Sequence, residues 1–348
     1  MAVGELIRNP AGPAPLRRPN SVRRTTTIET SWPEGMDQPA LMIGRGRDLL
    51  TPADRSAPVV LAEAEFRMRV TDAREILEIE VSPPHPNAAN LCGGSGGKSS
   101  RTRLQAEMGD REGDLLYQLL DDFSGASLVC IWAKLLWQEI TDPAAFGLLV
   151  PQIEATQGRQ VDVCIGLASG SSSQRRAGNF TLLNHFTTVP DLRHPLDPAG
   201  WHDFSESSGP QSQRSRRIDV WLEPGSIAVD SAFQDSAMHP GEGRIAVHEY
   251  ALSGAIDRAS GELAWFEPEA RILPHPECPA AMIEAQRMAR LPVAGFRTSV
   301  RENLPGVLGC THLNDVLRAL ADVPRLAKPL SDSASTSAVG LTSACPHA

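Results

Sequence analysis

Two long stretches of alternating apolar and polar residues constrain the fold of this chain more than any other feature. Residues 59–72 and residues 245–257 both have the two-residue period of a strand with one buried face. The aspartates that end them, Asp72 and Asp257, lie 185 residues apart. A short turn and a second expected strand follow each stretch. The sequence therefore predicts one strand pattern that is used twice.

Further elements repeat in the same order. The other expected strands cover 22–32, 40–45 and 76–81 in the first half, and 216–221, 227–233 and 262–266 in the second. Each half then has a His-Pro pair and an apolar helix, which we expect to open at 124–128 and at 308–312. Runs of strands followed by helices predict an α+β fold of two tandem repeats, each an antiparallel sheet backed by helices.

Composition shifts divide the 348 residues into five parts. The N-terminus is rich in proline and arginine, the C-terminus in serine, threonine and alanine, and a polar linker precedes residue 217. The predicted parts are a disordered arm (1–21), a first repeat (22–141), a connector or lid (142–216), a second repeat (217–327) and a disordered tail (328–348).

Charge and hydropathy limit the classes of partner. The formal net charge of -9 disfavours a nucleic-acid binder, which neutralises phosphates with clustered lysine and arginine. No apolar run is long enough to span a membrane, and the N-terminus lacks the apolar core of a signal peptide. We therefore expect a cytoplasmic protein without nucleic-acid or membrane partners, and its oligomeric state stays open. In that compartment the six cysteines are expected to be thiols, metal ligands or nucleophiles.

A glycine-rich stretch over 93–100, GGSGGKSS, suggests a phosphate-binding loop. The spacing does not fit, because Cys92 stands where that motif requires its first glycine, and no buried strand is expected before it. The stretch therefore predicts a flexible loop, and no nucleotide cofactor is expected.

Two cysteines stand where helices are expected to begin. Cys310 and His312 precede an apolar stripe of helical period, with Thr311 as the expected N-cap, and Cys278 precedes Pro279, a residue favoured in the first turn. The positive end of a helix dipole lowers the pKa of a thiol and favours the thiolate, which binds metals and attacks electrophiles. We therefore expect Cys278 and Cys310 to be reactive or metal-bound, with Cys164 of the connector as a possible third thiol.

The proposed repeat provides an internal comparison. The first-half residues matched to Cys278, Cys310 and His312 are all apolar: Ala88, Ala126 and Leu128. His248 and Glu249, matched to Glu63 and Ala64, complete a donor set that suits Zn²⁺ or Fe²⁺. His275 has a counterpart in His85, which favours a structural role in its turn. The alternative is that both cysteines are small buried apolar residues and that the histidines only form hydrogen bonds.

The same residues resemble a known family. Residues 308–322, the segment 273–279 and the strand with His248 are similar to a bacterial family called domain of unknown function 2889, over most of 22–327. This resemblance implies a SufE/NifU-like fold, a curved antiparallel sheet backed by helices. It also implies metal-binding positions at His248–Tyr250, Cys278 and Cys310–His312. The first cysteine of the NifU pattern is absent here, which favours a single metal ion over a cluster.

The sequence leads to one principal hypothesis and three rivals. We expect a metal-dependent enzyme, a lyase or hydrolase, that acts on a small organic molecule, for example in a catabolic pathway. His248, Cys278, Cys310 and His312 would hold Zn²⁺ or Fe²⁺, and Glu249 or Cys310 would act in catalysis. The alternatives are an iron-sulfur or sulfur-transfer accessory protein, a metal-free cysteine enzyme that uses Cys310, and a non-catalytic ligand-binding protein.

Overall fold

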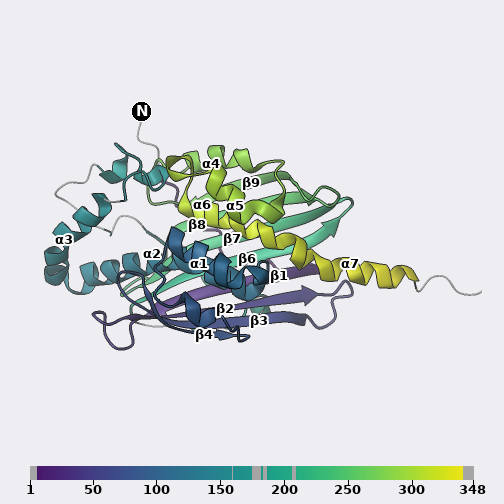
Figure 1. The fold of residues 1–348 in the computed structure, drawn as a ribbon, viewed down its shortest axis with the longest axis horizontal. Helices are drawn as coiled ribbons and strands as arrows, with labels where there is room; N and C mark the ends of the chain where they lie inside the picture. The colour runs from purple at the N-terminus through teal and green to yellow at the C-terminus, as the bar shows by residue number, and fades with distance from the viewer. Residues whose placement is uncertain (1–5, 159, 175–181, 183–185, 206–208, 340–348) are drawn as a thin grey trace, which may run out of the picture.

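The computed structural model describes residues 6–158, 160–174, 182, 186–205 and 209–339. Within these residues, nine strands form one antiparallel sheet in the order β4-β3-β2-β1-β6-β7-β8, with β9 and the short β5 both paired to β8 (Figure 1). The strands are β1 (Ser21–Ser31), β2 (Ala40–Thr51), β3 (Val59–Val70), β4 (Ile76–Ser82), β5 (Thr187–Thr188), β6 (Gln211–Glu223), β7 (Ser226–His239), β8 (Gly243–Asp257) and β9 (Leu263–Ile272). The α+β class is confirmed.

The two halves of the sequence share this sheet. β1 to β4 and β6 to β9 are each a run of four antiparallel strands, and the first strands of the two runs pair with each other from Ser21↔Trp221 to Ser31↔Gln211. All eight strands expected from the sequence are present, and most extend beyond the expected bounds. The halves therefore meet strand to strand at the centre of the molecule.

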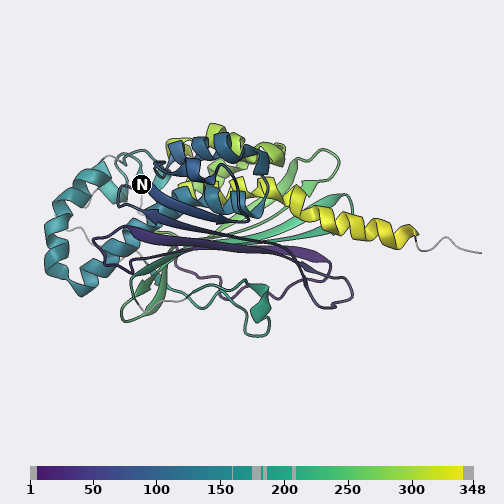
Figure 2. The ribbon, with the colours of Figure 1, turned by 60° about the horizontal axis from the view of Figure 1, so that its bottom comes forward.

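Helices cover one face of the sheet (Figures 1 and 2). They are α1 (Lys98–Met108), α2 (Leu115–Thr141), α3 (Pro143–Gly158), α4 (Ala280–Ala285), α5 (Phe296–Asn303), α6 (Thr311–Ala319) and α7 (Val323–Val339). The expectation that a helix opens at 124–128 is wrong, because these residues lie in the middle of α2. Nearly every residue of the first half of α2 is buried, so its sequence has no apolar stripe that would mark the start. None of the described helices is long and apolar enough to cross a membrane.

The opposite face of the sheet is covered by the N-terminal arm and by part of the connector (Figure 2). Arg17 pairs with Asp197 at 2.6 Å, Ala14 N donates to the carbonyl of Leu192, and His202 lies buried against Thr25. The arm was expected to be disordered, yet residues 6–20 lie along this face, because their backbone and arginine side chains find partners there.

The C-terminal residues also depart from the expected disorder. Residues 328–339, assigned to the tail, continue helix α7. Leu326, Ala327 and Leu330 are buried in the apolar core under the second half, which anchors the beginning of this helix. The remaining tail, 340–348, and residues 1–5 lie outside the described residues.

Charged residues are buried between the sheet and the helices, and they form matching rows in the two halves. Arg24 of β1 lies directly opposite Asp48 of β2 and binds it through two hydrogen bonds of 2.7 Å. Arg214 of β6 lies opposite Asp235 of β7 and binds it at 2.9 and 2.7 Å. A β-bulge follows each aspartate, at Asp48/Leu49 and at Asp235/Ser236. The third residue of each row differs: Ala62 lies opposite Asp48, and His248 lies opposite Asp235.

Candidate functional site

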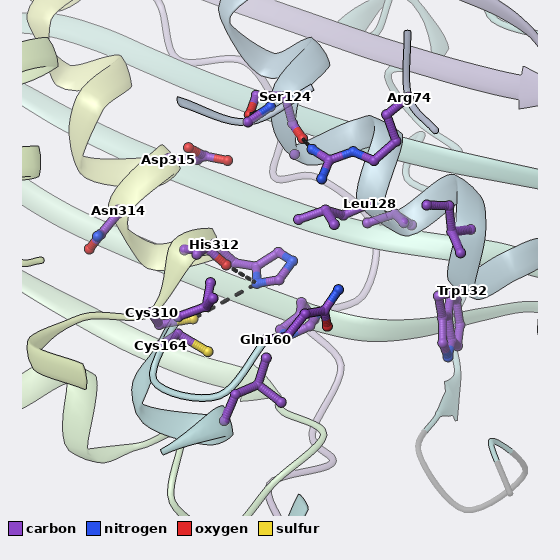
Figure 3. A pocket seen from close by; sticks show the side chains of 18 of the residues that line it. Arg74, Ser124, Leu128, Trp132, Gln160, Cys164, Cys310, His312, Asn314 and Asp315 are labelled. Carbon is purple, nitrogen blue, oxygen red and sulfur yellow. Dashed lines mark hydrogen bonds between the residues drawn. The ribbon is translucent and has the colours of Figure 1, made fainter. Parts of the chain in front are cut away.

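A cavity of about 1830 Å³ lies between the helices and the sheet, and residues of both halves line it, among them Arg74 and His248. Its walls come from α2, α5, the first turn of α6, residues 160–167 of the connector and His248 of β8 (Figure 3). A cavity of this size, wider than most small-molecule sites, accommodates an organic substrate together with water.

Three side chains from three elements converge beside this cavity, and two of them, His248 and His312, line it. Asp235 of β7, His248 of β8 and His312 of α6 offer ligand atoms that all lie within 4.8 Å of one another. The His312 Nε2 atom is 3.3 Å from Asp235 Oδ2, and the two imidazole rings stack with centroids 3.4 Å apart. Two imidazoles and a carboxylate are a donor set that binds zinc or iron(II).

The sheet and α6 hold these groups in place. His248 is the cross-strand neighbour of Asp235, and the adjacent bulge turns both His248 and Val247 toward the cavity. Helix α6 begins at Thr311, so Cys310 takes the N-cap position that was expected for Thr311. His312 therefore lies in the first turn of α6, above the strand pair.

Asp235 has a second role, because its carboxylate binds the Arg214 guanidinium on two sides. Arg214 also donates to Asp315 Oδ2 at 2.8 Å, so the charges at this point compensate one another away from water. The side chain of Asp235 is fully buried, and that of His312 is 13% exposed. A carboxylate has about four acceptor positions, so binding Arg214 leaves Asp235 able to contact a cation as well.

Both histidines are neutral at pH 7. Burial lowers the pKa of His312 to about 4, although Asp235 opposes the shift, and burial also lowers the pKa of His248, with the neighbouring His312 and His275 adding to the effect. The Nδ1 atom of His248 is buried and finds no hydrogen-bond partner among the described residues. His312 Nδ1 lies 3.3 Å from Thr311 Oγ1, which can fix the ring orientation. Neutral imidazoles with a free nitrogen are the form that binds a metal ion.

Three thiols lie beside this group rather than within it. Cys310 Sγ is 3.9 Å from His312 Nδ1, and the Cys164 thiol lies beside Cys310 (Figure 3). Cys164 adds to the raised pKa of both Cys278 and Cys310. The buried hydroxyl of Tyr250 lies near these thiols, and burial together with Cys310 and Cys278 raises its pKa. The described structure thus brings His248 and His312 together as expected, with Cys278 and Cys310 as neighbours.

The expected lowering of the thiol pKa is wrong. Burial raises the pKa of Cys310 to about 11 and raises that of Cys278 further above its usual value. The backbone N–H groups of His312 and Leu313 stabilise the Cys310 thiolate, as expected at a helix start, but the loss of water outweighs them. Without a metal ion, both residues are protonated thiols at neutral pH.

Glu249 does not reach the cavity. Successive side chains of a strand point to opposite faces, so Glu249 lies on the face away from His248. Its carboxylate accepts hydrogen bonds from Ala11 N at 2.7 Å and from Gln234 Nε2 at 3.2 Å. It therefore anchors the N-terminal arm, and we leave it out of the site.

The connector contributes Cys164 to the site. The segment around it is a turn followed by a short 3-10 helix at Ile165–Leu167. The Ile165 N–H donates to the carbonyl of Gly309 at 2.9 Å, which ties this segment to the start of α6. His275 also lines the cavity, beside Cys278, and so lies closer to the site than its expected role in a turn suggested.

Asp235 and Arg214 are the site residues that the sequence reasoning missed. Both lie in buried strands where a charged side chain is unusual, and each has a counterpart in the first half, Arg24 and Asp48. Charged residues at matching places in the strands of the two halves were the available signal.

Comparison with known proteins places part of the chain in a family. No curated protein and no solved structure matches it. Residues 212–325 match a family model described as "Protein of unknown function (DUF2889)". The match begins at β6 and ends in α7, so it includes Arg214, Asp235, His248 and His312. The resemblance to DUF2889 is therefore found over residues 212–325, a shorter part of the chain than the 22–327 expected from the sequence.

Proposed function

We propose that this protein is a metal-dependent enzyme, a lyase or hydrolase, that acts on a small organic molecule. The observation that carries the proposal is the convergence of Asp235, His248 and His312 within 4.8 Å beside a cavity that both histidines line. The ligand set differs from the one expected from the sequence, because Asp235 takes the place of Cys278 and Cys310.

The residues fit a divalent cation on two counts. The buried Nδ1 of His248 has no hydrogen-bond partner among the described residues, and a metal ion would remove the cost of leaving it so. Three protein ligands also leave positions free on the cavity side, as catalytic sites require. Zn²⁺ and Fe²⁺ both suit this donor set.

The residues around the cation would divide the work between binding and orientation. A divalent ion at this place would polarise a carbonyl group or lower the pKa of water. Arg214 holds the carboxylate of Asp235 in a fixed direction, and Thr311 supports the ring of His312. The thiol of Cys310, next to His312, is placed to contact the reacting group or to serve as an additional ligand.

The proposal includes a duplication in which one half carries the site. The matching rows Arg24-Asp48-Ala62 and Arg214-Asp235-His248, each followed by a bulge, support an internal repeat. They also revise its register, because Ala62 rather than Glu63 corresponds to His248. The SufE/NifU likeness stays a prediction.

Metal content of protein purified without a histidine tag tests the proposal. We expect stoichiometric zinc or iron in the wild-type protein and strong loss in His248→Ala and His312→Ala. Glu249→Gln is the matched control, because Glu249 follows His248 in the same strand but faces away from the cavity. A wild-type protein that neither contains nor takes up Zn²⁺ or Fe²⁺, or an equal loss in the control, would overturn the proposal.

A second candidate function rests on the three thiols. The buried Cys278 and Cys310 and the half-buried Cys164 lie near the hydroxyl of Tyr250, and thiolates are the ligands that iron-sulfur clusters use. An iron-sulfur or sulfur-transfer accessory protein would use this arrangement. It predicts a visible chromophore after anaerobic reconstitution with iron and sulfide, lost in Cys310→Ser, whereas a colourless protein with bound zinc favours the metalloenzyme.

The metal-free cysteine enzyme is supported less well. The side chains of Cys310, His312 and Asp235 do form a row in space. Cys310 Sγ is 3.9 Å from His312 Nδ1, and His312 Nε2 is 3.3 Å from Asp235 Oδ2. However, burial raises the pKa of Cys310 and lowers that of His312, which favours a neutral thiol and a neutral imidazole over the ion pair that such enzymes use.

A further inference from the structure

Arg74 lines the cavity, and among the described residues it has no acidic partner. The Arg74 guanidinium donates from Nε to Ser127 Oγ at 3.0 Å and from one terminal nitrogen to the carbonyl of Ser124 at 2.7 Å. No ion pair joins it to a carboxylate of the described chain, and the nearby Arg101 and Arg214 repel its charge. Burial lowers the pKa of Arg74 to about 10, and at neutral pH it still carries its proton.

The neighbouring arginines are compensated. Arg101 pairs with Asp315 and Asp121, and Arg214 pairs with Asp235 and Asp315. Lys134, which also lines the cavity, pairs with Asp72 at 2.6 Å. Of these four cationic side chains, Arg74 is therefore the one whose positive charge is not balanced. A ligand with one negative charge would balance it.

The backbone around Arg74 is built to present this side chain. Arg74 lies in the turn between β3 and β4 with φ of +66°, a conformation that favours glycine. The turn between β8 and β9 has Gly261 with φ of +73°. Arg74 therefore occupies a backbone position at which the corresponding turn of the second half has glycine.

The glycine-rich loop completes this arrangement. It was expected to be flexible, yet Gly96 N donates to the Arg74 carbonyl at 2.8 Å, and a Cβ on Gly96 would come within 2.7 Å of the guanidinium. Gly97 begins helix α1 without a capping side chain and also lines the cavity, so the positive end of the helix faces the same region. The loop thus makes room for the guanidinium beside the cavity.

An apolar wall runs from Arg74 along α2. Ser124, which holds Arg74, is followed at helical spacing by Leu128, Trp132 and Leu135, and all four line the cavity (Figure 3). The indole Nε1 of Trp132 is buried without a hydrogen-bond partner among the described residues. His312 lines the same cavity, so a molecule bound along this wall would share the cavity with the proposed metal site.

We propose that the cavity binds a small organic acid, whose carboxylate is held by Arg74 and whose apolar body lies along Leu128 and Trp132. Guanidinium groups bind carboxylates with directed, charge-assisted hydrogen bonds. That this acid is the substrate rests on the proposed function, whereas its binding needs only the cavity and Arg74.

Calorimetric titration of the full-length protein tests the inference. The probes are benzoate, phenylacetate and cinnamate, each paired with its neutral amide, and phenyl phosphate. We expect at least one carboxylate to bind at least tenfold more tightly than its amide, and Arg74→Gly to remove that preference. Arg74→Lys, which keeps the charge but not the planar fork, should retain part of it.

The control and the metal arm make each failure recognisable. Arg55→Gly is the matched control, because Arg55 also has a positive φ, +57°, but does not line the cavity. All titrations are run on metal-loaded and on EDTA-treated protein. A carboxylate preference that depends on Arg74 in both forms supports the inference even if no metal is found. Equal binding of acids and amides, no binding of any acid, an unchanged preference in Arg74→Gly, or tighter binding of phenyl phosphate would each overturn it.

Discussion

Replacing Asp48 or Asp235 with asparagine removes the same type of interaction from matching places in the two halves. Each aspartate binds an arginine of the neighbouring strand through two hydrogen bonds. Each arginine keeps another carboxylate at 2.8 Å, Asp322 for Arg24 and Asp315 for Arg214. The two substitutions therefore form a matched pair, in which only Asp235 also contacts His312 and belongs to the proposed metal site.

The structure sets the size of the effect on stability. Removing one charge of a buried ion pair costs about 3–5 kcal/mol, and we expect about 3 kcal/mol here, because each arginine keeps its second partner. At about 2.1 cal/mol/K per residue, the 348-residue chain has an unfolding entropy of roughly 0.7 kcal/mol/K. Both variants should therefore melt about 4 °C below the wild-type protein when all three are free of metal.

Calorimetric melting of EDTA-treated protein and metal analysis of untreated protein measure the two roles separately. We expect similar losses of melting temperature in Asp48→Asn and Asp235→Asn, and loss of metal only in Asp235→Asn. Full metal content in Asp235→Asn would show that Asp235 is not a ligand. Equal loss of metal in Asp48→Asn would show that the effect comes from general destabilisation, and unaltered melting would refute the assigned role of the buried ion pairs.

Three further predictions follow from burial. The metal-free protein should lose stability as the pH falls from about 6.5 to about 4, because His312 takes up a proton near pH 6.5 when unfolded but only near pH 4 when folded. Urea titrations at pH 7 and 5 measure this loss, and an equal loss in His312→Asn would contradict the prediction. Cys310 of the metal-free protein should react with iodoacetamide about 100-fold more slowly at pH 7.5 than a free thiol, because its pKa is raised to about 11. Mass spectrometry measures the labelling, and rapid labelling would favour the metal-free cysteine enzyme instead. Gly125→Ala should destabilise the protein by about 1–3 kcal/mol, because its methyl group would overlap the Arg214 guanidinium. Gly147→Ala, on an exposed part of α3, should stabilise the protein by about 0.5–1 kcal/mol. Denaturant titrations compare the two variants, and equal effects would contradict the packing around Arg214.

The strands could be predicted because their signal is local. Alternation of apolar and polar side chains over 59–72 and 245–257 depends only on neighbours in the chain, and both strands are present. Helix α2 gave no such signal, since its first half is buried on all sides between the sheet and other helices. The arm was predicted to be disordered because its partners, among them Asp197 and Glu249, are far away in the sequence.

The site was predictable to the extent that its residues stand at helix starts or in strands of clear pattern. His312 follows Cys310 at the start of α6, and His248 lies in a strand of strong alternation, so both were found. Asp235 depends on the register of three strands and on the bulge beside it, which no local pattern contains. The thiol pKa was predicted in the wrong direction for a related reason, because the degree of burial depends on packing between distant elements.

The proposed metal group is built on an ion pair that the fold also uses elsewhere. Arg24 and Asp48 form the same pair in the first half, where Ala62 offers no ligand, so this half shows what the pair does without a metal. In the second half, His248 replaces the alanine across the strand, and α6 brings His312 to the same carboxylate. Asp235 thus arrives already oriented by Arg214, and two histidines are enough to complete the group. In such a site the fixed carboxylate comes from an ion pair of the sheet and requires no additional loop. This explains why Asp235, which stabilises the fold through Arg214, also lies at the centre of the proposed metal site.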